Sequence, residues 1–392
     1  MQHELISHSP DLKRLKDEGY GIQIKGGLLI VHQIPYLNEK KEIAYGKLVS
    51  ELSLQGGTRT IPPSTHVLHF SGTYPCFIDG TPITALKLGE GVQEITKGIM
   101  VNYSFSNKPG RNYTDYYEKI STYANIISAP AKAIDNNVTE KPFMTFEEDA
   151  EGSVFMYEDT NSGRANITAI SEKLKGQRIA IVGTGGTGSY ILDFVAKTPV
   201  QEIHLFDSDH FYVHNAYRTP GAASLEDLDR QLKKVEYLYE KYSKMHKGIM
   251  PNDVRIVSDT LPKLKAMSFV FIAIDKGEVK KGIIEFLLKE GIPFVDVGLG
   301  LEVKNNTLLG SVRTTTGTPE KNDHLNKYIS FVDEEDDGYN SNIQIAELNA
   351  LNACFAVIKW KKLFGFYNDM EKEFNTVYVV NESQLVNNEI SS

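Results

Sequence analysis

The chain has 392 residues, of which 41% are hydrophobic and 24% are charged, so it is long enough for two domains that each bury a core. Its formal net charge of −9 leaves no broad basic surface, which argues against a nucleic-acid partner. The sequence shows no signal peptide and no apolar stretch of membrane-spanning length, and its two cysteines cannot form a disulfide framework. A cytoplasmic protein without a membrane partner is therefore expected.

The first part of the chain, residues 1–147, predicts a smaller α+β domain. Short strands are expected at 21–33 and 66–71, where apolar residues gather between turn signals. A longer stretch with helical periodicity predicts a helix at 113–133.

The most distinctive segment of this part contains His66, His69 and Cys76. A metal site is disfavoured, because three ligands are few and the two histidines would point to opposite faces of a strand. Two interpretations stay open. One is a reactive thiol in a conjugating-enzyme-like domain; the other, which the composition favours, is a strand and a Tyr-Pro turn with Cys76 as a small buried residue.

A linker is expected at 148–165, where two acidic, turn-rich stretches surround one short apolar stretch. It would separate the first domain from a second domain at 166–387. Residues 388–392 are expected to form a frayed tail.

The second domain alternates strands and helices, which is typical of a doubly wound parallel sheet. Strands are expected at 178–182, 202–206, 254–257, 269–274, 293–297 and 308–313. Helices are expected at 187–197, 225–243, 278–290 and 343–362. The predicted fold class is therefore α/β, a Rossmann-like doubly wound domain preceded by a smaller α+β domain.

A glycine-rich turn follows the first of these strands. Gly183, Gly185 and Gly188, with Gly186 between them, give the spacing G-x-G-x-x-G directly before a helix. Glycines let the backbone approach phosphate oxygens, and the free N–H groups of a helix start can bind them. The turn therefore predicts a nucleotide site, although the same pattern occurs in NAD and FAD sites.

The residues after the second strand favour ATP over NAD. Asp207 and Asp209 end that strand, and Asn215, Arg218 and Lys234 follow. A dehydrogenase needs only the acidic residue, which binds the ribose hydroxyls. The additional polar and cationic side chains suit a triphosphate, whose charge needs several positive donors.

Asp275 follows the strand expected at 269–274, at the sheet edge where ligands bind. One interpretation is a magnesium ligand, since Mg²⁺ prefers one or two carboxylates together with phosphate oxygens. The other is an N-cap for the helix that begins near 278. The neighbouring motifs favour the metal.

Residues 160–365 resemble the ThiF/MoeB-type adenylyltransferases, which include the ubiquitin-activating enzymes. The pattern D-x-D-x-x-x-x-x-N-x-x-R, formed by Asp207, Asp209, Asn215 and Arg218, carries this resemblance together with the glycines. It implies ribose binding by Asp207, phosphate binding by Arg218 and Lys234, phosphate orientation by Asn215 and Mg²⁺ binding by Asp275.

Two positions of the resemblance have alternatives. Lys234 is further from Arg218 than the family pattern leads us to expect, so Lys233 is a second candidate. Arg164 resembles an arginine that such enzymes contribute to the phosphates, often across a dimer interface. A surface arginine near a domain boundary is the alternative for Arg164.

Cysteine usage departs from the family. Many relatives hold a structural zinc with four cysteines, but this chain contains only Cys76 and Cys354, so a cysteine zinc site is excluded. Cys354 lies within the helix expected at 343–362, where a core position is favoured over a nucleophile.

Many relatives also carry a cysteine nucleophile in a loop that corresponds here to 336–342, which contains none. The acyl group would then pass on directly as an adenylate, or through an oxyester. Ser341, at the position of that cysteine, and the threonines 314–316 are the hydroxyl candidates.

The resemblance implies a reaction in which the C-terminal glycine carboxylate of a ubiquitin-like protein attacks ATP in the presence of Mg²⁺. The products are an acyl-adenylate and pyrophosphate, and the enzyme is expected to be a homodimer. The segments 105–109 and 115–119 resemble the uncharacterised domain that precedes ThiF domains in some bacterial operons for ubiquitin-like proteins. This implies a bacterial pathway with a separate conjugating-enzyme-like protein and a role in antiviral defence. Two alternatives stay open: adenylation of another carboxylate, on a sulfur carrier or a tRNA-linked group, and a non-catalytic nucleotide-binding scaffold.

Overall fold

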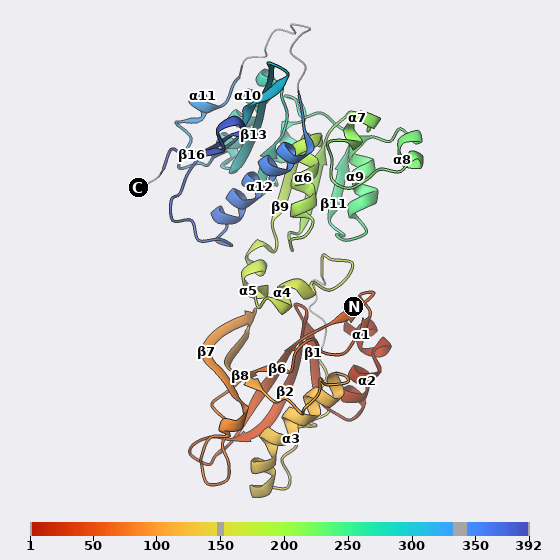
Figure 1. The fold of residues 1–392 in the computed structure, drawn as a ribbon, viewed down its shortest axis with the longest axis vertical. Coiled ribbons are helices and arrows are strands. Elements are labelled where there is room, and N and C mark those ends of the chain that lie inside the picture. Colours follow the sequence, from red (N-terminus) through yellow and green to blue (C-terminus); the bar gives the residue numbers. More distant parts are fainter. Residues whose placement is uncertain (1, 147–152, 332–342, 391–392) are drawn as a thin grey trace. The chain divides into compact units, whose positions relative to one another are not determined.

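The computed structural model describes residues 2–146, 153–331 and 343–390. The chain forms two compact units, Met1–Glu172 and Lys173–Ser392 (Figure 1). Among the described residues, no helix combines the length and the apolar character that crossing a membrane requires.

The first unit is built on an antiparallel sheet of six strands in the order β1-β2-β3-β6-β8-β7. These strands are β1 (Gly21–Lys25), β2 (Leu28–Leu37), β3 (Ile43–Glu51), β6 (Val67–Ser71), β7 (Lys87–Thr96) and β8 (Ile99–Ser106). A small second sheet pairs β4 (Leu54–Gln55) with β5 (Arg59–Thr60). The helices of this unit are α1 (Gln2–His8), α2 (Pro10–Asp17), α3 (Tyr116–Ile134), α4 (Thr160–Arg164) and α5 (Thr168–Ser171).

The main core of this unit lies between the sheet and the helices α1, α2 and α3. Alternate residues of the strands point into it, among them Val31 and Phe70, and α3 contributes Tyr116 and Ile120. The side chain of Asp115 caps α3 by accepting a hydrogen bond from the backbone N–H of Glu118 at 2.7 Å, which is why the helix begins at 116.

Residues just after the expected linker, which were assigned to the second domain, pack onto the first unit. Thr168 donates from its hydroxyl to the carbonyl of Gly26 at 3.1 Å, at the turn between β1 and β2. The carboxylate of Glu172 accepts from the backbone N–H of Lys97 at 2.8 Å, at the turn between β7 and β8. The first compact unit, which ends at Glu172, therefore includes α5 as well as α4.

Cys76 has the surroundings of a structural residue. Its side chain is buried, and its thiol donates to the carbonyl of Tyr74 at 3.4 Å. Burial raises the pKa of this thiol, which suppresses the reactive thiolate. His69 contacts the hydroxyl of Ser104 at 3.0 Å. These contacts favour the second of the two interpretations of the segment.

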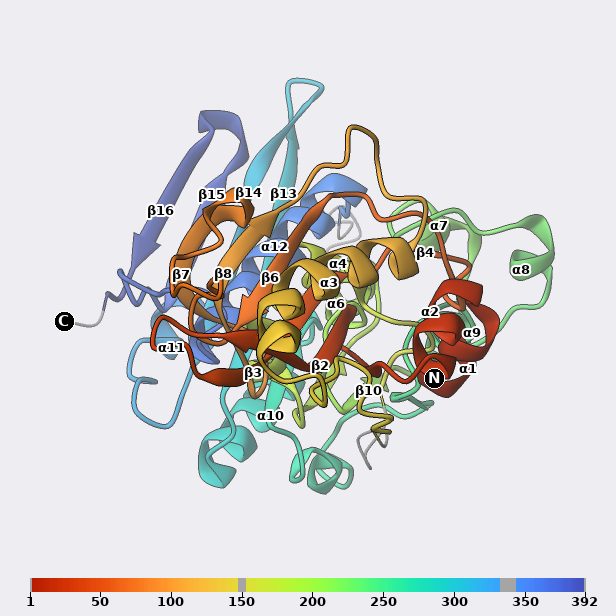
Figure 2. The ribbon, with the colours of Figure 1, turned by 90° about the horizontal axis from the view of Figure 1, so that it is seen from below.

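The second unit has a sheet of eight strands in the order β11-β10-β9-β12-β13-β14-β15-β16. The first five are parallel neighbours: β9 (Arg178–Val182), β10 (Glu202–Phe206), β11 (Ile249–Asn252), β12 (Phe269–Ile272) and β13 (Phe294–Lys304). If these five strands are numbered as they follow in the chain, their order across the sheet is 3-2-1-4-5, the arrangement of a Rossmann-type half. The antiparallel strands β14 (Thr307–Gly317), β15 (Asn375–Val379) and β16 (Gln384–Asn388) extend the sheet beyond β13 (Figure 2).

Helices cover both faces of this sheet. The helices of the second unit are α6 (Gly186–Val195), α7 (Val213–Ala216), α8 (Leu225–Asp229), α9 (Lys234–Tyr242), α10 (Gly277–Glu290), α11 (Leu325–Tyr328) and α12 (Ala346–Leu363). One core holds residues of α6, α9 and α12, and a second core holds residues of α10 and α11. The predicted fold class, a Rossmann-like domain after a separate smaller domain, is confirmed.

Two expected elements of the second unit differ in the structure. The strand expected at 254–257 lies at 249–252 instead, where Pro251 is tolerated because β11 is an edge strand. The helix expected at 225–243 is split into α8 and α9. Gln231, between them, has a φ of +47°, which a continuous helix does not allow.

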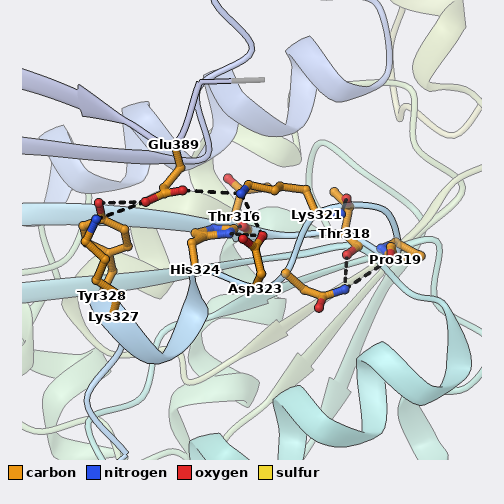
Figure 3. Close-up of polar contacts among 10 residues, drawn as sticks. Thr316, Thr318, Pro319, Lys321, Asp323, His324, Lys327, Tyr328 and Glu389 are labelled. Atoms are coloured by element: carbon orange, nitrogen blue, oxygen red, sulfur yellow. Dashed lines mark hydrogen bonds and ion pairs between the residues drawn. The ribbon is translucent and has the colours of Figure 1, made fainter. Parts of the chain in front are cut away.

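Asn388 and Glu389, the first two residues of the stretch expected to be a frayed tail, make defined contacts. Asn388 still belongs to β16 and pairs with Asn375 of β15. The carboxylate of Glu389 accepts hydrogen bonds from Tyr328 at 3.1 Å, Lys327 at 3.2 Å and Lys321 at 3.4 Å (Figure 3). These bonds attach Glu389 to α11 and to the loop before it.

Candidate nucleotide site

A cavity of about 520 Å³ lies at the carboxyl ends of the parallel strands in the second unit. The chain reverses its direction of winding between β9 and β12, and this is the place in such sheets where ligands bind. The cavity is lined by Gly183, Gly185, Gly186, Thr187, Asp207, Asp209, Arg218, Lys234, Ala273, Ile274, Asp275, Lys280, Val297, Gly298, Leu299, Gln344, Asn349 and Asn352. Eight of the residues that the sequence predicts for the site are in this set.

Two of the glycines are fixed by packing, and a third is not. Gly183 has a φ of +88°, and a Cβ there would lie 2.4 Å from the carbonyl oxygen of Ala273. A Cβ on Gly188 would lie 1.9 Å from the carbonyl oxygen of Gly183. A Cβ on Gly185 would meet no protein atom within 4 Å. Gly185 also lines the cavity, so a ligand is the group whose approach its missing side chain would permit.

Asp207 organises the glycine turn from the end of β10. Its carboxylate accepts from the backbone N–H of Thr184 at 2.8 Å and from the hydroxyl of the same residue at 3.1 Å. The other oxygen accepts from the backbone N–H of Asp209 at 2.9 Å. Asp207, the acidic residue expected to bind the ribose, therefore joins the end of β10 to the glycine turn that follows β9.

The cationic side chains Lys234 and Arg218 both line the cavity. Lys234 donates to Asp209 at 2.8 Å, and this ammonium holds the pKa of that carboxyl below its ordinary value. Lys233, the alternative, points its ammonium to the carbonyl of Ser208 at 2.7 Å and is not among the residues that line the cavity. The geometry therefore favours Lys234.

Arg218 has an incompletely satisfied guanidinium. Its Nε is buried and has no hydrogen-bond partner among the described residues. Burial lowers the pKa of Arg218, and the carboxylate of Asp275 opposes that shift. A half-buried cation whose buried Nε has no partner in the described part of the chain is suited to an anionic ligand, because that unpaired N–H is costly without one.

Asp275 lies between β12 and α10 and lines the cavity. The N-cap of α10 is Lys276, so Asp275 is not in the capping position that was its alternative interpretation. Within the described residues, no group of three or more His, Cys, Asp or Glu side chains could hold a metal by itself. An Mg²⁺ held between one carboxylate and phosphate oxygens needs no such group.

The sequence did not indicate a buried ion-pair chain beside the cavity. Lys280 of α10 lines the cavity and pairs with the fully buried carboxylate of Asp296 on β13 at 3.0 Å. Arg313 on β14 pairs with the other oxygen of that carboxylate at 2.6 Å. Lys280 follows Asp275 by five residues, but only the turn that starts α10 brings both to one cavity.

Polar side chains of α12 form another wall that the sequence did not indicate. Asn352 donates to the carbonyl of Gly298 at 2.9 Å and accepts from the hydroxyl of Thr314 at 3.1 Å. Asn349 accepts from the hydroxyl of Thr187 at 2.8 Å. These residues lie more than 150 positions from the glycine turn in the chain, so no local pattern connects them to it.

The remaining predicted residues lie elsewhere. Asn215 is buried, and its side-chain oxygen accepts from the backbone N–H of Tyr212 at 2.9 Å; it is not among the residues that line the cavity. Gly188 contributes to the turn without lining the cavity. Arg164 ends α4 in the first unit, and its role as a phosphate ligand stays a prediction. Ser341 lies outside the described residues.

The other hydroxyl groups considered as acyl acceptors, and the thiol of Cys354, are hydrogen-bonded, buried or half-buried. Thr314, Thr315 and Thr316 are buried in β14, and Thr315 donates to Asn375 at 2.8 Å. Cys354 is half-buried in α12, and burial raises the pKa of its thiol. None of these four residues is among those that line the cavity.

The model of the ThiF family matches residues 162–357, half of the chain. The chain belongs to the ThiF family. Its ThiF domain therefore has the adenylyltransferase-like, nucleotide-binding fold of that family, which confirms the predicted resemblance. A second model, a domain of unknown function named DUF6791, matches residues 10–160. A comparison with curated proteins found no match.

Solved structures similar to this chain are distant from it in sequence. Escherichia coli MccB in complex with ATP is 15% identical, with 78% of this chain and 96% of that chain covered and a TM-score of 0.48. PaaA is 14% identical, with 69% and 87% covered and a TM-score of 0.47. The E. coli tRNA N6-threonylcarbamoyladenosine dehydratase TcdA, in complex with AMP, is 21% identical, with 51% and 91% covered and a TM-score of 0.40.

Proposed function

We propose that this ThiF-family protein uses ATP and Mg²⁺ to adenylate the C-terminal glycine of a ubiquitin-like protein. The carboxylate oxygen of the glycine attacks the α-phosphorus of ATP, and the bond from that phosphorus to the pyrophosphate oxygen breaks. The products are the acyl-adenylate and pyrophosphate. The acyl group then passes to an acceptor as the adenylate or through an oxyester.

One observation carries this proposal: a single cavity joins the glycine turn, two strand-end aspartates and three cationic side chains. Asp207 and Asp209 suit the ribose end of a nucleotide, while Arg218, Lys234 and Lys280 supply positive charge to its phosphates. The open Nε of Arg218 is a donor without a protein partner among the described residues. Such a set positions and neutralises phosphates, which is most of what phosphoryl-type transfer requires.

Asp275 is the residue that we propose for Mg²⁺. When bound, the ion would neutralise charge on the phosphates as pyrophosphate leaves. Asp275 lies within electrostatic reach of Arg218, so one side of the cavity would hold the metal and the guanidinium close to the same phosphates.

The surroundings of both cysteines support a route without a thioester. Burial raises the pKa of Cys76 and of Cys354, which lowers the thiolate fraction available for attack. A mixed anhydride with AMP is reactive enough to transfer its acyl group to another acceptor. We propose Ser341 as the acceptor if an oxyester forms.

The partners of the reaction follow from the same proposal. A ubiquitin-like protein would supply the carboxylate, and a separate conjugating-enzyme-like protein would receive the acyl group. A homodimer would allow Arg164 of one protomer to serve the phosphates bound by its partner. The first unit, which contains the domain of unknown function, would recognise these proteins.

ATP–pyrophosphate exchange tests the proposed function. Exchange that appears only when a ubiquitin-like protein with a free C-terminal glycine is added supports the proposal. Exchange with a different carboxylate, on a sulfur carrier or a tRNA-linked group, would assign the same chemistry to another substrate. ATP binding without exchange for any carboxylate would show a nucleotide-binding scaffold and would contradict the proposal.

A further inference from the structure

Asn349 is an unusual residue in the wall of the cavity. It lies inside α12, it is 1% exposed, and it lines the cavity. Its amide nitrogen is buried and has no hydrogen-bond partner among the described residues. A buried N–H group left unpaired costs on the order of 1–3 kcal/mol, so such a group is retained where a ligand completes it.

The orientation of this amide is fixed from its other end. The hydroxyl of Thr187 donates to the side-chain oxygen of Asn349 at 2.8 Å. Because the oxygen is occupied, the amide nitrogen is the end that remains available as a donor. Thr187 lies in the first turn of α6 and also lines the cavity.

The unpaired nitrogen lies at the start of α6, next to the glycine turn. A Cβ on Gly186 would come within 2.2 Å of it, closer than to any other atom. Gly186 is the first residue of α6, and Gly185 at the N-cap has no side chain that could occupy the free N–H groups there. Helix starts with free N–H groups attract phosphate, and α6 is ten residues long.

We infer that Asn349 is a phosphate-binding residue, whose amide nitrogen donates to a phosphate oxygen of the nucleotide held at the start of α6. Thr187 acts as its positioning residue. The inference rests on the proposed function, because it assumes that the cavity binds ATP. It adds a neutral donor from α12 to the cationic groups of Arg218 and Lys234, which belong to the part of the chain between β10 and β11.

Affinities for ATP·Mg²⁺ and for adenosine, measured by calorimetry on the full chain, test this inference. Asn349→Ala removes the donor, and we expect the affinity for ATP to fall about tenfold or more while the affinity for adenosine changes less than about twofold. Asn349→Asp keeps the oxygen that Thr187 binds and replaces the donor by an acceptor. We expect Asn349→Asp to lower the affinity for ATP more than Asn349→Ala does, because a carboxylate repels phosphate.

Asn305→Asp is the matched control for the added charge. Asn305 is exposed at the tip of the β13–β14 hairpin, with a φ of +51° that aspartate tolerates, and we expect it to leave ATP affinity unchanged. A similar loss in Asn305→Asp and Asn349→Asp would show a general charge effect and would contradict a local repulsion of phosphate at Asn349.

A double-mutant cycle tests the part played by Thr187. Thr187→Val should weaken ATP binding in the wild-type chain but have little further effect in Asn349→Ala, because its action passes through the amide. Additive losses would overturn the positioning role.

Three outcomes contradict the main inference, and they differ from one another. An unchanged ATP affinity in Asn349→Ala, with ATP binding intact in the wild type, overturns the inference alone. Equal losses for adenosine and ATP would show that Asn349 only supports the packing of α12 on α6. A wild-type chain that does not bind ATP overturns the inference together with the proposed function.

Discussion

Asp275 is the single residue on which the proposed magnesium chemistry depends. It is a carboxylate at a strand end, and it shares a cavity with Arg218 and Lys280. Asp275→Ala should lower ATP–pyrophosphate exchange about a hundredfold, since charge stabilisation of this kind contributes about 3 kcal/mol to the transition state. The thermal stability should stay close to that of the wild type, because the side chain is exposed and fills no core volume. Glu278→Ala is the control: it removes an exposed carboxylate three residues away that is not among the residues lining the cavity. Near-normal exchange in Asp275→Ala would contradict the magnesium assignment.

His32 makes the stability of the first unit depend on pH. Burial lowers its pKa from 6.5 to about 4, and its ring stacks on Phe146 and contacts the amide oxygen of Gln23 at 3.0 Å. Because the folded state binds the proton less readily than the unfolded state, stability is complete above pH 6.5 and falls as the pH drops towards 4. The loss should be on the order of 1–3 kcal/mol.

Urea unfolding of His32→Gln at several pH values checks this expectation. The variant should show a smaller change between pH 6.5 and 4 than the wild type. The pKa of Glu18 is lowered to about 2, so its contribution falls in a more acidic window, between about 4.5 and 2, and should remain in the variant. An unchanged pH dependence in His32→Gln would exclude His32 as the cause.

At the scale of elements, the glycine turn between β9 and α6 separates packing from ligand binding. Gly188→Ala places a Cβ 1.9 Å from a backbone oxygen of Gly183, so the protein should lose several kcal/mol of stability or fail to fold. Gly185→Ala meets no protein atom within 4 Å, so its melting temperature should stay near that of the wild type. Its affinity for ATP should nevertheless fall, because the methyl group adds to the cavity wall. Normal ATP affinity in Gly185→Ala would show that the nucleotide does not approach the turn there.

The sequence predicted those helices and strands that a local pattern of residues is enough to specify. The strands β9 and β10 lie at 178–182 and 202–206, as expected, because a short apolar run between turn signals is a local pattern. β15 and β16 were not predicted, since their alternation is weak and each forms by pairing with its neighbour in the sheet: β15 pairs with β14, and β16 pairs with β15. The pairing of β15 with β14 joins residues about 60 positions apart, which no window of sequence contains.

The same distinction applies to the site. Gly183, Asp207 and Arg218 belong to one stretch of chain around the glycine turn, so their spacing could be recognised. Lys280 and Asn349 reach the cavity from α10 and α12, and only the winding of the sheet brings them there. A lysine or an asparagine inside a helix carries no local sign that it lines a cavity, so these residues could be found only in the structure.

At the scale of the whole molecule, the two compact units should be distinguishable in unfolding. The single tryptophan, Trp360, is fully buried in the second unit, where its indole N–H donates to Gln177 at 3.0 Å and its ring meets Phe271 edge-on. Its fluorescence therefore reports the unit that contains the cavity. ATP·Mg²⁺ at a hundred times its Kd should stabilise that unit by about 2.7 kcal/mol.

Circular dichroism, which detects both units, supplies the comparison. If the units unfold independently, ATP·Mg²⁺ should shift the fluorescence transition to higher temperature and leave a second transition, seen only by circular dichroism, where it was. That second transition should be the one that His32→Gln alters with pH, because His32 lies in the first unit. The alternative outcome is a single transition that both probes follow and that ATP shifts to higher temperature. It would show that the two units unfold as one cooperative structure. Nucleotide binding would then also stabilise the first unit.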